Sequence, residues 1–140
     1  MSRPPLTLQN VVAEREKGLK SVPALPAFLV GRPRAPLVLV ADDVIGGVPV
    51  KRFVPTGARK GVTLIWAHGG GWVFMSVDAL AAVFSVIASI YGVEIVAVKY
   101  RKAPEHTFPA AYDDVLAVTR AIARAPAAGR VFVGGDSAGD

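Results

Sequence analysis

Ser137 lies at the centre of the segment Gly135-Asp136-Ser137-Ala138-Gly139, directly after the apolar run 130–134. A serine raised on a sharp turn after a strand needs glycine two residues before and two residues after it, because larger side chains there would collide. The amide of Ala138 would then point toward the oxygen that becomes negative when the serine attacks a carbonyl. The pattern indicates nucleophilic chemistry at Ser137, with an ordinary glycine turn as the alternative, since such a pattern also arises by chance.

A second glycine cluster, His68-Gly69-Gly70-Gly71-Trp72, follows another apolar run at 62–67. Consecutive glycines leave backbone N–H groups unobstructed, which suits the binding of a small anion. We therefore expect Gly69, Gly70 and Gly71, together with Ala138, to form an oxyanion hole for the nucleophile Ser137. A flexible loop is the alternative, but two motifs in this order, each after an apolar run, favour a serine hydrolase. A nucleotide-binding domain is disfavoured, because neither G-x-G-x-x-G nor G-K-[ST] occurs.

The segments around these motifs alternate between strand and helix patterns. Five runs have the length and pattern of strands: 38–43, 48–54, 62–67, 93–98 and 130–134. Apolar residues at steps of three and four predict helices over 78–91 and 109–124. The order predicts an α/β fold with a mostly parallel sheet and helices on both faces.

The ends of the two predicted helices carry recognisable signals. Ser76 or Asp78 is placed to cap the N-terminus of the first helix, and Gly92 is placed to end it. Pro109 is expected at the first position of the second helix, where its missing N–H costs little. Between the first two strands, Gly46-Gly47 predicts a turn.

Residues 1–37 differ from the remainder of the chain. They contain six prolines, at positions 4, 5, 23, 26, 33 and 36, and only 8–20 has a helix-compatible pattern. We interpret 1–37 as an N-terminal arm and a candidate part of a cap, and 38–140 as the N-terminal half of a hydrolase domain.

Composition and charge exclude several classes of function. The chain is 52% hydrophobic, carries a net charge of +5 and has no cysteine, so disulfides and thiolate metal sites are excluded. The basic excess lies in the first 40 residues and is not interleaved with aromatic side chains, so we expect no nucleic-acid partner. The N-terminus shows no signal-peptide pattern, and the uncharged stretch 79–93 is too short to span a bilayer, so we expect a cytoplasmic protein. We expect no metal and no cofactor.

The segment 100–114, YRKAPEHTFPAAYDD, together with the two glycine motifs, resembles the hormone-sensitive-lipase-like branch of the α/β-hydrolases, the α/β hydrolase fold-3 family. The resemblance covers about 48–140. It implies a bacterial carboxylesterase or lipase that acts on a small-molecule ester through an acyl-enzyme intermediate at Ser137. It also implies that His68 orients the glycine loop rather than acting as the base, and that His106 is structural. Four positions depart from the usual family residues: Met75, Lys99, Lys102 and Asp140.

In α/β-hydrolases the acid and the histidine of the triad follow the nucleophile along the chain. Here only Ala138, Gly139 and Asp140 follow Ser137, and Asp136 lies too close to the nucleophile to orient a histidine. We therefore expect an α/β-hydrolase fold truncated after the nucleophile elbow and inactive alone. The alternative is a non-catalytic esterase remnant or interaction fragment, with self-association through an exposed sheet edge at 130–134.

Overall fold

The structure is a computed structural model that describes residue 15, residues 37–126 and residues 129–139. The N-terminal arm and its predicted helix over 8–20 lie outside the described residues, apart from Arg15. The description therefore covers nearly all of the proposed hydrolase part of the chain.

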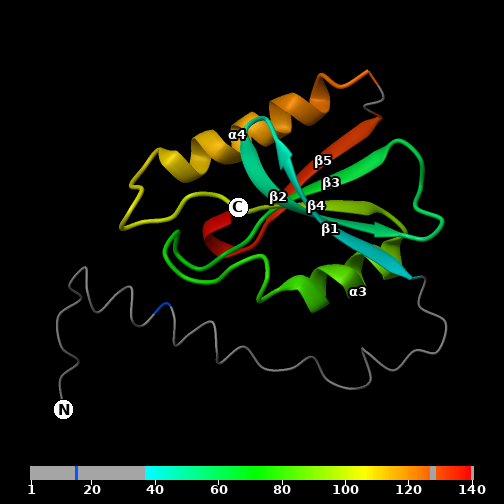
Figure 1. The fold of residues 1–140 in the computed structure, drawn as a ribbon, viewed down its shortest axis with the longest axis horizontal. Helices are drawn as coiled ribbons and strands as arrows, with labels where there is room; N and C mark the ends of the chain where they lie inside the picture. Colours follow the sequence, from blue (N-terminus) through cyan, green and yellow to red (C-terminus); the bar gives the residue numbers. More distant parts are fainter. Residues whose placement is uncertain (1–14, 16–36, 127–128, 140) are drawn as a thin grey trace, which may run out of the picture.

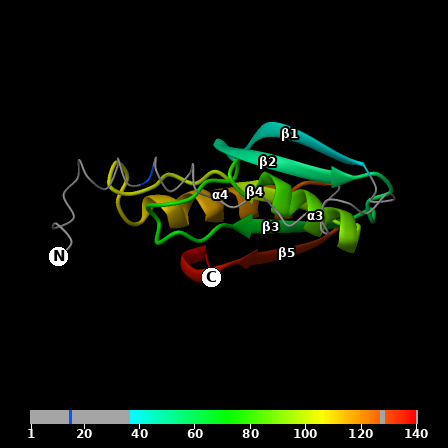
Figure 2. The same cartoon turned by 90° about the horizontal axis from the view of Figure 1, so that it is seen from below.

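A single five-stranded sheet forms the centre of the molecule (Figure 2). Its strands are β1 (Val38–Ile45), β2 (Val48–Pro55), β3 (Val62–Ala67), β4 (Glu94–Val98) and β5 (Arg130–Gly135). Their spatial order is β1-β2-β4-β3-β5, with β4, β3 and β5 parallel to one another. β1 pairs antiparallel with β2, and β2 pairs antiparallel with β4, so parallel pairing is restricted to one half of a mixed sheet.

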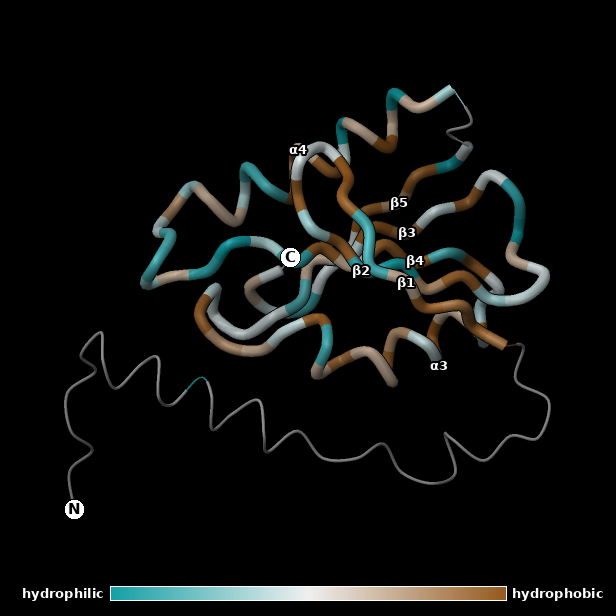
Figure 3. The backbone as a smooth tube through the Cα atoms, viewed as in Figure 1, coloured by the Kyte–Doolittle hydropathy of each residue, from teal (hydrophilic) through white to brown (hydrophobic). Residues whose placement is uncertain are grey.

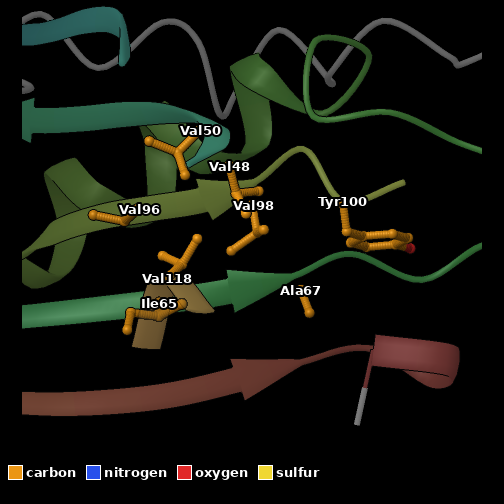
Figure 4. Close-up of a cluster of buried hydrophobic side chains, with 8 residues drawn as sticks. All are labelled: Val48, Val50, Ile65, Ala67, Val96, Val98, Tyr100 and Val118. Carbon is orange, nitrogen blue, oxygen red and sulfur yellow. The ribbon is translucent and has the colours of Figure 1, made fainter. Parts of the chain in front are cut away.

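Two helices cover opposite faces of the sheet, α3 (Ala81–Tyr91) on one and α4 (Ala110–Ala123) on the other (Figure 1). On the α3 face, Phe84 and Ala88 pack with Phe53 and Ile95. On the α4 face, Val118 packs with a group of strand residues that includes Val50, Ile65, Val96 and Val98 (Figure 4). The strands are apolar along much of their length, which is why burial on both faces stabilises this layered arrangement (Figure 3).

The N-terminus of α3 differs from the prediction. The helix begins at Ala81, and the capping position is Leu80, which provides no side-chain hydrogen bond. Ser76 instead accepts a hydrogen bond from the amide of Ala79 at 3.1 Å, within the preceding turn. Asp78 forms an ion pair with Lys51 at 2.6 Å. The prediction that Ser76 or Asp78 caps the helix was therefore wrong, because both side chains have partners elsewhere.

The other predicted helix boundaries agree closely with the structure. Gly92 ends α3 with φ = 63°, and its N–H donates to the carbonyl of Ala88 at 2.9 Å. Glycine suits this position because side chains disfavour the left-handed region. Pro109 occupies the capping position, so α4 begins at Ala110, one residue later than predicted.

β5 forms one edge of the described sheet and pairs only with β3. Two of its large apolar side chains, Phe132 and Val133, are 52% and 56% exposed. Val131 is better covered, because it packs against the cluster beneath α4. Within the described ranges, neither helix is long and apolar enough to cross a membrane.

Candidate active site

Ser137 occupies a strained turn immediately after β5. Its φ of 55° lies in the left-handed region, and residues 137–139 form a single turn of 3-10 helix. A Cβ on Gly135 would overlap the carbonyl group of Gly139, and a Cβ on Gly139 would overlap the carbonyl group of Ala67. The glycines on both sides of Ser137 are therefore required by close backbone approach. The serine itself is exposed to solvent.

The glycine loop lies directly beside this turn. Gly69 is buried, and a Cβ on it would lie 2.6 Å from the carbonyl oxygen of Asp136 and 3.2 Å from Cβ of Ser137. Gly70 and Gly71 follow with φ of 119° and 61°. Among hydrogen bonds between described residues, none is donated by the amides of Gly69, Gly70 or Gly71. The structure thus places Gly69, whose amide has no described partner, next to Ser137, at the C-terminal ends of β3 and β5, where open parallel sheets bind ligands.

The loop closes on itself through the carbonyl oxygen of Gly70. That oxygen accepts hydrogen bonds from the amides of Val73 at 3.2 Å and Phe74 at 2.8 Å. Two residues that follow the glycines, Trp72 and Met75, have left-handed φ values of 58° and 63°. Cγ of Met75 lies 3.0 Å from the point that a Cβ on Gly70 would occupy. Met75 therefore packs against the glycine loop.

His68 is buried and its Nδ1 lies 2.6 Å from the carbonyl oxygen of Gly69. Its ring stacks on Tyr100 with centroids 4.5 Å apart, and the Tyr100 hydroxyl donates to the backbone carbonyl of His68 at 2.5 Å. Burial lowers the pKa of His68 despite its bond to Gly69, so the ring is neutral at pH 7, and the proton on Nδ1 is donated to that carbonyl. Burial also raises the pKa of Tyr100 to about 12, which keeps its hydroxyl a donor.

Asp136 connects the serine turn to the sheet. Its Oδ1 accepts a hydrogen bond from Nε1 of Trp66, on β3, at 3.0 Å. The side chain is exposed and therefore screened by solvent. Asp136 supports the turn from outside, and nothing in the sequence pattern had paired it with Trp66.

The segment 100–106 makes contacts that residue patterns alone do not reveal. Asp114, only 6% exposed, accepts hydrogen bonds from the backbone amide of Arg101 at 2.8 Å and from its guanidinium at 2.8–3.1 Å. The amide of Ala103 donates to the carbonyl of Trp72 at 3.0 Å. These bonds attach the segment to α4 on one side and to the glycine loop on the other. The bond between Ala103 and Trp72 joins two backbone groups, which leave no signature in side-chain types.

His106 is exposed, and its amide donates to the carbonyl of Lys102 at 2.9 Å. Among the described contacts, none joins His106 to Ser137 or to the glycine loop. The structure thus brings Ser137, Gly69, Gly70, Gly71, Ala138 and His68 to one end of the sheet and leaves His106 outside this group.

Comparisons with known proteins show the family to which the chain belongs. Residues 64–140 match a family model described as the alpha/beta hydrolase fold. The chain is 33% identical over 136 residues to a carboxylesterase of Mycobacterium tuberculosis and 32% identical over 104 residues to a versiconal hemiacetal acetate esterase of Emericella nidulans. These alignments cover 93% and 74% of this chain.

Solved structures of an esterase and of a hormone-sensitive lipase also superpose on the chain. An esterase from the archaeon Pyrobaculum calidifontis superposes with a TM-score of 0.79 at 30% identity, over 99% of this chain and 45% of that one. A hormone-sensitive lipase from a metagenome library superposes with a TM-score of 0.73 at 29% identity, over 99% of this chain and 43% of that one. The chain also covers 41% of the mycobacterial carboxylesterase and 36% of the Emericella esterase, so it spans less than half the length of these relatives.

Proposed function

We propose, from the premise that this chain belongs to the α/β-hydrolase fold family in its hormone-sensitive-lipase-like branch, that Ser137 is the nucleophile of a carboxylic ester hydrolase. One observation carries the proposal: Gly69 packs against Ser137 in a loop whose glycine amides have no described partner. A nucleophile on a strained turn beside unpaired amide donors is the arrangement that acyl transfer requires.

In the proposed mechanism, the hydroxyl of Ser137 attacks the ester carbonyl and loses its proton to a base. The negative charge that develops on the carbonyl oxygen is stabilised by amides of the loop Gly69–Gly71 and by the amide of Ala138. Collapse of the tetrahedral intermediate expels the alcohol and leaves an acyl group on Ser137. Water then attacks this acyl-enzyme, releases the carboxylic acid and restores the serine.

The base must come from a residue other than His68. Nδ1 of His68 is bonded to the loop's own carbonyl, and its ring is buried against Tyr100. In this chain no histidine follows Ser137. We therefore propose that the base and its orienting acid belong to a segment equivalent to the part of the relatives that this chain does not cover, and that these 140 residues alone do not hydrolyse esters.

A second candidate function is a non-catalytic interaction fragment. The exposed side chains of Phe132 and Val133 on the edge strand β5 favour it, because an unpaired strand edge is a template for association. The two candidates differ in their dependence on Ser137: only the hydrolase requires its hydroxyl.

Fragment complementation tests the proposal. The chain is mixed with a polypeptide comprising the part of the mycobacterial carboxylesterase that this chain does not cover, and release of p-nitrophenol from p-nitrophenyl butyrate is followed. Hydrolysis is expected only in the mixture, and Ser137→Ala should abolish it. Turnover that survives Ser137→Ala would contradict the nucleophile assignment. Serine-dependent turnover by the chain alone would contradict the proposal that the base lies elsewhere. Absence of turnover in a mixture shown by light scattering to contain the complex would favour the interaction fragment.

A further inference from the structure

Lys102 makes an unusual contact with the glycine loop. Its Nζ donates to the carbonyl oxygen of Met75 at 2.5 Å, and the lysine is partly buried. A long cationic side chain ordinarily keeps its charged end in water, because desolvation of an ammonium is costly. Here that group is instead directed at one backbone carbonyl. The contact is a charge-assisted hydrogen bond, the stronger class of hydrogen bond in proteins.

The residue whose carbonyl it binds is held in a strained conformation. Met75 has φ = 63°, a region that side chains with a Cβ adopt at a cost and that glycine adopts freely. Cγ of Met75 lies beside Gly70, so a change at Met75 would be felt by the glycine loop. A strained backbone persists only where surrounding contacts hold it in place. The ammonium of Lys102 is such a contact.

The backbone that carries Lys102 is fixed from two sides. On one side Arg101 is bound by the buried carboxylate of Asp114. On the other, the guanidinium of Arg15 donates to the carbonyl of Ala103 at 2.7 Å and to the carboxylate of Glu105 at 2.8 Å. Because both neighbours of Lys102 are anchored, its side chain approaches Met75 from a preorganised position.

Three donors from this short segment reach three carbonyls of the glycine loop and its flanks. Tyr100 donates to His68, Ala103 donates to Trp72, and Lys102 donates to Met75. Each bond ties a carbonyl of this region to the segment 100–103, whereas the amides of Gly69, Gly70 and Gly71 donate no described hydrogen bond. The contact of Lys102 is the one that reaches the far end of the loop.

We infer that Lys102 is a positioning residue for the oxyanion loop: its ammonium holds Met75 in the left-handed conformation and thereby fixes the turn that presents the amides of Gly70 and Gly71. The inference rests on the proposed function for the role of the loop. Its physical content, the coupling of Lys102 and Met75, is independent of turnover. Failure of ester hydrolysis and failure of this coupling are therefore separate results.

Amide hydrogen exchange of the chain, followed by NMR, tests the coupling. The reporters are the amides of Val73 and Phe74, which donate to Gly70 and open when the turn opens. In Lys102→Met, which keeps an unbranched side chain but removes the ammonium group with its charge and donors, their exchange is expected to rise roughly tenfold. Amides of β4 should stay unchanged, because the global stability is not the quantity affected. Lys102→Arg, which keeps a cationic donor, should retain most of the protection.

The decisive variant combines Lys102→Met with Met75→Gly. Glycine adopts the left-handed conformation without strain, so the double variant should regain protection to within about threefold of the starting chain. Lys60→Met, at an exposed lysine with no described hydrogen bond or ion pair, is the matched control and should change nothing.

The inference is overturned by unchanged exchange at Val73 and Phe74 in Lys102→Met, or by an equal rise at β4, which would indicate general destabilisation. Loss of protection in Lys102→Met that Met75→Gly fails to restore would also overturn the coupling. If Lys102→Met does not fold, the solvent exchange of lysine ammonium protons in the unmodified chain tests the contact instead. Slower solvent exchange at Lys102 than at Lys60 supports the contact, and equal exchange refutes it.

Discussion

Gly69 packs so closely against Ser137 that a methyl group on the glycine would lie 3.2 Å from Cβ of the serine and 2.6 Å from the carbonyl oxygen of Asp136. The glycine loop and the serine turn are therefore packed together, although 68 positions separate Gly69 from Ser137 in the chain. A larger side chain at position 69 must therefore displace the serine turn.

Gly69→Ala should destabilise the chain by about 3 kcal/mol, because its new methyl group meets backbone atoms that have no room to move. Gly57→Ala is the comparison: a Cβ there meets nothing within 4 Å, so only its φ of 77° resists alanine, at about 1 kcal/mol. Urea denaturation of both variants measures the difference. An equal or smaller loss for Gly69→Ala would contradict the packing described for the two motifs.

Asp114→Asn should lower the free energy of unfolding by about 2 kcal/mol at neutral pH, because the hydrogen bonds to Arg101 lose their charge. Asp113→Asn is the matched control, since the side chain of Asp113 is exposed and makes no described hydrogen bond. Burial raises the pKa of Asp114, but hydrogen bonds and the charge of Arg101 outweigh it and leave the pKa below its usual value. This contribution is present above the unfolded pKa of about 3.9 and disappears as pH falls through the lower folded pKa.

Denaturation curves between about pH 5 and pH 2 check this direction. The unmodified chain and Asp113→Asn should lose stability over this range more steeply than Asp114→Asn. Parallel losses in all three proteins would show that Asp114 does not carry the acid dependence.

Tyr100→Phe should reduce stability by about 1–2 kcal/mol, since it leaves the buried carbonyl of His68 without its donor. It should also flatten the alkaline side of the stability profile. Burial raises the pKa of Tyr100 to about 12, so its contribution is complete below the unfolded pKa of about 10 and is lost as pH rises through 12. Tyr91→Phe, at a tyrosine that is 63% exposed, should keep the alkaline slope of the unmodified chain. The same slope in both variants would argue against this role of Tyr100.

The sequence predicted the elements that depend on strong local patterns. The strand 62–67 was predicted to the residue, and α4 and Gly92 were predicted within one residue, because continuous apolar runs and helix-ending glycine have few alternatives. The start of α3 was misplaced, because Asp78 pairs with Lys51, a residue far away in sequence. Antiparallel pairing of β2 with β4 was likewise not predicted, since strand order is decided by packing between distant segments.

The same distinction holds at the site. The positions of Ser137 and the glycines follow from steric demands that only glycine meets, and those demands are visible in residue types. The supporting contacts of Tyr100 and Lys102 are made to backbone carbonyls, which every residue possesses. No pattern of side chains distinguishes a carbonyl that will be bound from one that will not. The supporting contacts of these two residues are therefore seen only in the folded chain.

The last prediction concerns association of the chain through the edge strand β5. Its outer edge has no strand partner in the described sheet, and Phe132 and Val133 are more than half exposed. The chain is expected to self-associate or to be partly unfolded at micromolar concentration, because such an edge accepts a further strand. Burial of apolar surface stabilises a fold by about 25 cal/mol per Å², so apolar area left uncovered lowers the free energy of unfolding of a small domain.

Val133→Lys should shift the chain toward monomer, because a charge on an edge strand opposes pairing with a second strand. Ile90→Lys places the same charge on α3 at a side chain that is 63% exposed, and should leave association unchanged. Light scattering after size-exclusion chromatography over a tenfold concentration range, together with thermal melts, separates the outcomes. A monomer with one sharp cooperative melt in the unmodified chain would contradict the prediction, because it would show that β5 is stable as an open edge. Equal loss of association in both lysine variants would place the contact outside β5.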